Sequence, residues 1–171
     1  MRINKFPLFL FLLAGISLSF WGCERDDICA EGTPTTPMLI IKFLDFDNTS
    51  EIKNPVELEV RAVGVENPFN FGTVTDSIMI PLRTNESITE YQLTINSDTT
   101  NDEVASNTDT ISIQYTPEEE YVSSACGFRV TFQGLSNSPV EAGDDGTWIQ
   151  DINVERLNVT DETTAHIFIF H

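Results

Sequence analysis

A two-residue alternation of apolar and polar side chains recurs in short runs between residues 38 and 171, and it restricts the fold more than any other feature. The clearest run is 56–62, where every second side chain is apolar and the three between them are Glu57, Glu59 and Arg61. A period of two places the apolar side chains on one face of a half-buried strand. No helical period of useful length appears after residue 22. The alternation therefore predicts an all-β protein.

We expect about eight strands, separated by turn-rich segments. Pro81 indicates that the strand containing it lies at a sheet edge or ends there, because proline cannot donate to a ladder. The longest expected strand is 118–132, in which Cys126 shares a face with large apolar side chains. A change of apolar parity between Val154 and Leu157 suggests a bulge. The expected strands are 38–46, 56–62, 77–83, 89–96, 111–115, 118–132, 148–159 (one strand or two) and 165–171, with loops at 67–72, 97–107 and 136–146.

Strands with one apolar face need a second layer to cover that face. We therefore predict an antiparallel β-sandwich over residues 38–171, Ig-like or fibronectin-like in general architecture, after an N-terminal signal helix. A β-barrel is the alternative.

The first 22 residues have the character of a secretory signal. Arg2 and Lys5 precede an apolar run, Phe6 to Leu13, which is shorter than the roughly 20 residues that span a bilayer. Gly22 is followed directly by Cys23, so the segment resembles a bacterial lipoprotein signal, in which the cysteine thiol is acylated and becomes the first residue. The bulky Phe20-Trp21 departs from the usual pattern, and an ordinary cleaved signal with an incidental cysteine is the alternative.

The segmentation that follows is a lipoprotein signal peptide at 1–22, a lipidated tether at 23–37 and the β-domain from 38. Acyl chains such as palmitate on Cys23 would anchor the protein in the outer membrane. Glu24-Arg25-Asp26-Asp27 resembles the acidic signal that sends lipoproteins of the Bacteroidota to the outer surface. We therefore expect a surface-exposed domain; a plain polar tether on a periplasm-facing protein is the alternative.

The chain is strongly acidic, with 9 basic and 27 acidic residues and a formal charge of −18. Loss of Arg2 and Lys5 with the signal would take the charge to −20. Such a surface repels phosphate backbones, so nucleic acid is not an expected partner.

Three cysteines are present, and acylation of Cys23 would leave Cys29 and Cys126. In an oxidising compartment these two are expected to form a disulfide. Six residue steps from Cys23 to Cys29 reach no more than about 20 Å, so the Cys126 end of the domain should lie close to the membrane.

Four segments carry a family resemblance: DDICAEGTPTTPMLIIKF, DSIMIPLRTN, EEYVSSACGFRVTF and the terminal AHIFIFH. They resemble a family of uncharacterised Bacteroidota lipoproteins, over nearly the whole chain after the signal. The resemblance implies that the anchor and the two remaining cysteines are family features, and it implies no catalytic or binding residues.

Residues with catalytic or metal-binding chemistry are few. His166 and His171 are five residues apart in the last expected strand, hence on opposite faces, so they do not suit one metal ion or a catalytic triad. Two acidic runs could supply oxygen ligands to calcium, but neither has EF-hand spacing, and we expect no cofactor. These runs are Asp45, Asp47, Asn48 and Glu51, and Asp98, Asn101, Asp102 and Glu103.

Three tripeptides resemble the Asp-Ser/Thr-apolar acceptor of Bacteroidota O-glycosylation, which makes Ser77, Thr99 and Thr110 candidate modification sites. Ordinary turn chemistry explains the same tripeptides. Phe69, Phe71 and Trp148 lie near expected loops, where they either stack on a sugar or close the end of the sandwich.

Taken together, the sequence predicts a lipid-anchored, non-enzymatic envelope module that binds a protein or a glycan. A structural subunit of a surface assembly, joined through sheet edges, is the alternative. A hydrolase is the least favoured, because the carboxylates lie mostly in turns.

Overall fold

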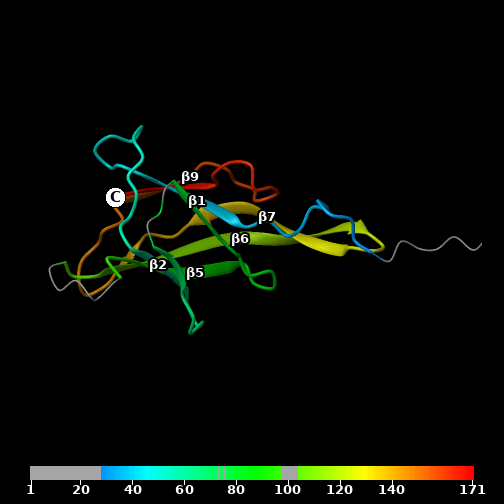
Figure 1. Cartoon of the computed structure of the whole chain (residues 1–171), viewed down its shortest axis with the longest axis horizontal. Helices are drawn as coiled ribbons and strands as arrows, with labels where there is room; N and C mark the ends of the chain where they lie inside the picture. The colour runs from blue at the N-terminus through cyan, green and yellow to red at the C-terminus, as the bar shows by residue number, and fades with distance from the viewer. Residues whose placement is uncertain (1–27, 73, 75, 98–103) are drawn as a thin grey trace, which may run out of the picture.

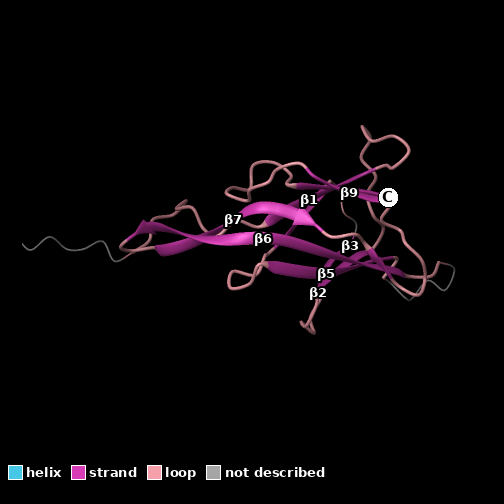
Figure 2. Cartoon of the chain, turned by 180° about the vertical axis from the view of Figure 1, so that it is seen from behind, coloured by secondary structure: helices cyan, strands magenta, loops and turns pink. Residues whose placement is uncertain are grey.

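In the computed structural model, residues 28–72, 74, 76–97 and 104–171 are described. They form ten strands and no helix, in two sheets (Figures 1 and 2). The predicted signal helix lies outside these residues, and within them no helix is long and apolar enough to cross a membrane. The strands are β1 (Leu39–Leu44), β2 (Leu58–Ala62), β3 (Phe69–Gly72), β4 (Ser77–Ile80), β5 (Ile88–Ile95), β6 (Asn107–Ser123), β7 (Gly127–Asn137), β8 (Glu141–Ala142), β9 (Asp151–Val154) and β10 (Ile167–Phe170).

A four-stranded sheet in the order β4-β1-β10-β9 faces a six-stranded sheet in the order β3-β2-β5-β6-β7, with β8 paired to β6. One core joins the two inner faces, and its residues are apolar at alternating positions, as the period of two requires. Its fully buried large side chains include Phe43 and Ile167 from the first sheet and Tyr91 and Phe132 from the second. The predicted all-β sandwich is confirmed.

One pairing departs from the antiparallel prediction. The first and last strands, β1 and β10, lie side by side and parallel, with Ile41 opposite Ile167. Because β10 has β1 on one side and β9 on the other, it is an interior strand of its sheet. The expectation that residues 165–171 lie in a sheet interior is thereby confirmed.

The structure corrects several element assignments. The expected loop at 67–72 contains the strand β3, which pairs with β2. Val56 is 60% exposed, since Glu57 has a positive φ of 48° and breaks the alternation before β2 begins. Only 151–154 of the expected strand at 148–159 is a strand, so the parity change after Val154 marks the end of β9 rather than a bulge.

The most important correction concerns residues 118–132, which are a hairpin and not one strand. β6 runs from Asn107 to Ser123, turns at 124–126 and returns as β7. Gly127 adopts a φ of 73°, which is in the left-handed region that glycine favours, and Cys126 therefore lies in the turn rather than on an apolar face. Pro117 is tolerated within β6 because β5 pairs with β6 only as far as Gln114.

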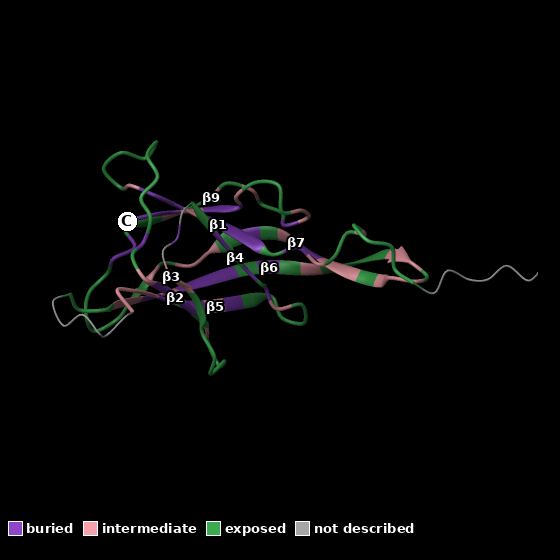
Figure 3. Cartoon of the chain, in the orientation of Figure 1, coloured by how far each residue is buried: buried purple, intermediate pink, exposed green. Residues whose placement is uncertain are grey.

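Past that point β7 is the strand that still pairs with β6, as far as the turn. We call residues 117–132 the arm and residues 121–128 its tip. Figure 1 shows the arm extending away from the two layers, and Figure 3 shows buried strand giving way to intermediate and exposed residues along it. The Cys29–Cys126 disulfide, with a Cα–Cα distance of 4.8 Å, joins the start of the described chain to this tip. The predicted disulfide is confirmed.

Candidate functional site: a groove on the four-stranded sheet

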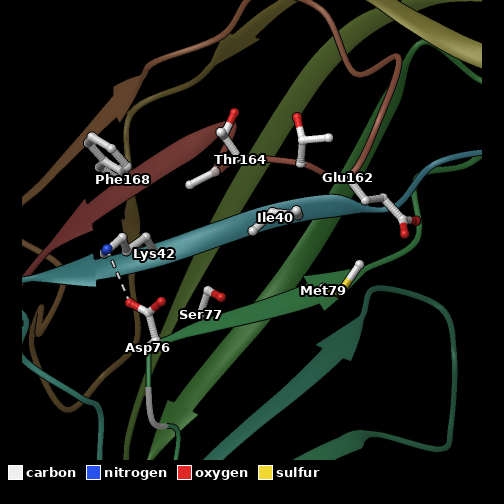
Figure 4. Close-up of a pocket in the computed structure, with 10 residues that line it drawn as sticks. Ile40, Lys42, Asp76, Ser77, Met79, Glu162, Thr164 and Phe168 are labelled. Carbon is white, nitrogen blue, oxygen red and sulfur yellow. Dashed lines mark ion pairs between the residues drawn. The ribbon is translucent and has the colours of Figure 1, made fainter.

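The outer face of the four-stranded sheet carries a groove of about 510 Å³. The strand register builds it: Ile40 of β1 is opposite Met79 of β4, and Lys42 lies between Ser77 of β4 and Phe168 of β10. Successive side chains of a strand point to opposite faces of the sheet. These residues therefore point outward, while their neighbours along each strand point into the core. Figure 4 shows their side chains gathered above β1, β4 and β10.

An ion pair closes one end of the groove. Lys42 Nζ lies 3.2 Å from Asp76 Oδ1, and both side chains are partly exposed (Figure 4). Met79, at 40% exposure, and Ile40 provide an apolar floor between this pair and the far end.

The far wall is the loop 162–165, which one carboxylate organises. Asp161 receives two hydrogen bonds from Arg156, at 3.0 and 2.8 Å, and a third from the Thr163 N–H at 3.0 Å. The Arg156 guanidinium, with the Thr163 groups, holds the pKa of Asp161 well below its usual range. Glu162 Oε1 then accepts a 2.7 Å hydrogen bond from the Met38 N–H, which ties the loop to the start of β1.

His166 joins this loop to β1 through two hydrogen bonds. Its backbone N–H donates to the Ile40 carbonyl at 2.9 Å, and its ring Nδ1 accepts from the Ile40 backbone N–H at 3.0 Å. The side chain is completely buried, and burial, with the Arg156 charge, lowers its pKa. His166 is therefore neutral at pH 7 and serves the structure as a hydrogen-bond acceptor. His171, at the other end of β10, packs edge-on against Trp148.

Acidification should weaken the fold through His166. Its folded pKa lies below the ordinary value of 6.5, so the unfolded chain takes up protons first as the pH falls below about 6.5. The free energy of unfolding should then decrease by up to about 1.4 kcal/mol per pH unit for this group. Urea unfolding between pH 7 and pH 5 measures the slope.

The matched variant is His166→Asn, whose amide oxygen replaces Nδ1 as the acceptor for the Ile40 N–H and does not titrate. Its slope should be reduced but not abolished, because burial also lowers the pKa of His171. Equal slopes in the parent and the variant would contradict this role for His166.

The groove combines an apolar strip with convergent polar groups, which is the usual character of a small-molecule or glycan site. Its polar groups are one ammonium, two carboxylates and three hydroxyls, and its lining contains neither histidine nor cysteine. The lining residues are Ile40, Lys42, Asp76, Ser77, Met79, Glu162, Thr163, Thr164, Ala165 and Phe168.

The predicted modification sites are distributed differently. Ser77 is exposed and lines the groove beside Asp76. Thr110 lies within β6, between Gln92 of β5 and Glu141 of β8, and the adjacent Asp109 is completely buried. Cys23 and Thr99 lie outside the described residues.

The other candidates do not assemble into a site. Phe69 and Phe71 are neighbours on the edge strand β3, with ring centroids 6.4 Å apart, whereas Trp148 is a core residue whose Nε1–H donates to the Leu93 carbonyl at 3.1 Å.

Asp45 uses one carboxylate oxygen to accept the N–H groups of Asn48 and Asp47, which lower its pKa, and pairs with Lys53 at 3.3 Å. The second acidic run lies entirely outside the described residues. Within the described residues, no three or more His, Cys, Asp or Glu side chains are grouped so that they could hold a metal ion.

Two features, one in the groove and one in the core, are not among the predictions from the sequence. Lys42 interrupts an otherwise apolar strand, and that single charge was the available signal for the groove. Asp109 has the same parity as Ile111 and Ile113, which are core residues, so a carboxylate directed inward could have been read from the alternation.

Comparison with known proteins adds one result. A family model described as a family of unknown function (DUF6452) matches residues 57–171, which include the loop 162–165 and the groove residues of β4 and β10. β1 and Cys29 precede the matched region. The comparisons with curated proteins and with solved structures found no match. Because the model matches more than half of the chain, the protein belongs to the DUF6452 family of unknown function.

Proposed function

We propose that this protein is a lipid-anchored, non-enzymatic module of the cell envelope that binds a glycan in the groove above β1, β4 and β10. The observation that carries the proposal is the lining of that groove, where an apolar strip lies between an ion pair and a wall of hydroxyls and a carboxylate. Sugar rings present both an apolar face and hydroxyl groups, so such a lining complements them. A short segment of an envelope protein is the other class of ligand that fits the same groups.

The envelope location has its own support. Disulfides persist in oxidising compartments, and Cys29 and Cys126 are bonded. Cys23 would then be the remaining cysteine, directly after a segment that resembles a lipoprotein signal. Intact-mass measurement of protein from its own cells is expected to show a chain that begins at acylated Cys23. A different first residue would refute the anchor.

Ligand binding is tested with Lys42→Ala against a panel of oligosaccharides. We expect binding to weaken about ten-fold or more, because hydrogen bonds to charged groups contribute about 1.5–3 kcal/mol. The fold should persist, since exposed ion pairs contribute at most about 1 kcal/mol.

The matched control is Lys53→Ala, which removes a similar lysine–aspartate pair outside the groove, with Asp45 at 3.3 Å. Its affinity for the same oligosaccharides should equal that of the parent. If no oligosaccharide in the panel binds, or if the two variants weaken binding equally, the glycan site is refuted.

A further inference from the structure

The tip of the β6–β7 arm exposes two aromatic side chains against each other. Tyr121 and Phe128 are opposite in the strand register, with ring centroids 5.3 Å apart, and are 58% and 66% exposed. They continue the face of β7 that carries Val130 and the core residue Phe132. The arm therefore extends an apolar face past the sheet that covers it elsewhere.

The start of the described chain is attached to this same tip. Ile28 is 85% exposed and is adjacent to Cys29, which is bonded to Cys126 in the turn. Thr36 Oγ1 also accepts the Val130 N–H at 2.9 Å, so the N-terminal segment follows the arm. Six residue steps from Cys23 to Cys29 reach about 20 Å at most. An acyl group on Cys23 would hold the tip within that distance of the bilayer.

The polar groups of the tip have partners on the hairpin itself. The Tyr121 and Ser124 hydroxyls are 3.1 Å apart, and the Cys126 N–H donates to Ser123 Oγ at 3.1 Å. Glu120 pairs across the strands with Arg129 at 2.6 Å. Partnered polar groups cost less to move out of bulk water than unpartnered ones. Glu118 and Glu119 lie farther from the turn than the aromatic pair.

We propose that Tyr121 and Phe128 of the tip, together with Ile28 next to the disulfide, enter the interfacial region of a lipid bilayer and orient the domain on the membrane. The inference rests on the proposed acyl anchor for its setting. Aromatic side chains favour the membrane–water interface, where one part of the ring system is apolar and another meets water. The rest of the surface is acidic and stays in solution, so the contact suits a leaflet without net charge.

The test uses residues 23–171, which contain all ten strands and the disulfide. In the oxidised protein Cys23 is the one cysteine outside the disulfide, and it is coupled to a maleimide lipid in phosphatidylcholine vesicles. Phe128→Trp is measured in vesicles with and without brominated acyl chains. We expect the fluorescence that the tryptophan at position 128 adds to that of the parent to be about two-fold lower in the brominated vesicles, because aromatic rings at the interface reach the boundary of the acyl chains. Replacing half of the lipid with anionic phosphatidylglycerol should weaken the quenching.

The matched control is Phe46→Trp, which introduces a tryptophan at a site that is 49% exposed. Phe46 belongs to the loop after β1, and Figure 1 shows this loop and the arm on opposite sides of the molecule. Its emission should be unchanged by bromine, as should that of the parent, whose Trp148 is in the core. Equal quenching at positions 128 and 46, or absence of quenching at both, would overturn the proposal. The chemical coupling replaces the natural anchor, so this result is separate from the mass measurement that tests acylation.

Discussion

Replacing both Cys29 and Cys126 with serine is expected to lower the free energy of unfolding by about 2–4 kcal/mol. The disulfide spans 97 residues of sequence and encloses β1 to β6. Without it the unfolded chain gains the conformational freedom of that long loop, while the folded state loses the covalent attachment of its N-terminal segment to the arm. Urea unfolding of residues 23–171 measures the difference, with the midpoint and the slope fitted separately.

Cys23→Ser in the same protein is the matched control, because it removes a cysteine and leaves the disulfide. Its unfolding curve should superimpose on that of the parent. A double serine variant as stable as this control would show that the disulfide contributes nothing to the fold.

Replacing Asp109 with alanine is expected to lower the free energy of unfolding by about 2–6 kcal/mol, because two buried donors each lose their partner at a cost of roughly 1–3 kcal/mol. Asp109 projects inward from β6 and is completely buried. Its Oδ2 accepts the Trp148 N–H at 2.9 Å and the Ile149 N–H at 2.8 Å. These two residues lead the chain from the six-stranded sheet to β9 of the other sheet, so one carboxylate fastens the crossover.

Asp109→Asn is the discriminating variant, because its amide oxygen still accepts hydrogen bonds but carries no charge. We expect a smaller loss of stability than with alanine. If Asp109→Ala and Asp109→Asn had the same free energy of unfolding, loss of the two hydrogen bonds from the Trp148 and Ile149 N–H groups would not be the source of the effect.

The stability of the parent should depend on pH in a way that the stability of Asp109→Asn does not, and the pKa of Asp109 gives the direction. Burial raises the pKa of Asp109, although the two N–H groups oppose that shift. The folded state thus binds a proton more readily than the unfolded state. The contribution of Asp109 to the free energy of unfolding is therefore largest below pH 3.8, and it is lost as the pH rises from 3.8 through the raised pKa of the folded state. Lowering the pH towards 4 should therefore stabilise the parent relative to Asp109→Asn. Thermal unfolding of both proteins across that range measures the change.

Local pattern accounts for much of the fold. Residues 39–44, 77–80 and 88–95 alternate or are mostly apolar, and they form strands near their predicted positions. Pro81 ends β4 as expected, at the edge of its sheet. These predictions succeed because burial on one face of a strand leaves a period of two in the residues themselves.

The assignments that failed depend on contacts distant in sequence. The sequence predicts one strand over 118–132 because one parity from Val122 to Phe132 is mostly apolar, whereas a turn needs only a glycine with positive φ, here Gly127. Similarly, Phe69–Gly72 reads as a loop in isolation and becomes β3 because an edge of β2 is available to pair with it.

The candidate groove was even less visible in the sequence. It needs β1 and β10 to be parallel neighbours, which places Lys42 beside Phe168 although 126 residues separate them in the chain. It also needs Asp161 and Arg156 to shape the loop above the sheet. No local pattern encodes a register between the two ends of a chain.

The sequence by itself determined the all-β class and the two-layer arrangement, which follow from a period of two. It also predicted the pairing of Cys29 with Cys126, from the expectation that Cys23 is acylated. The tertiary structure alone decided the parallel β1–β10 pair, the projecting arm with its aromatic tip, and the groove. Each of these is a contact between segments far apart in the chain, and its free energy depends on which surfaces meet when the two sheets close over one core.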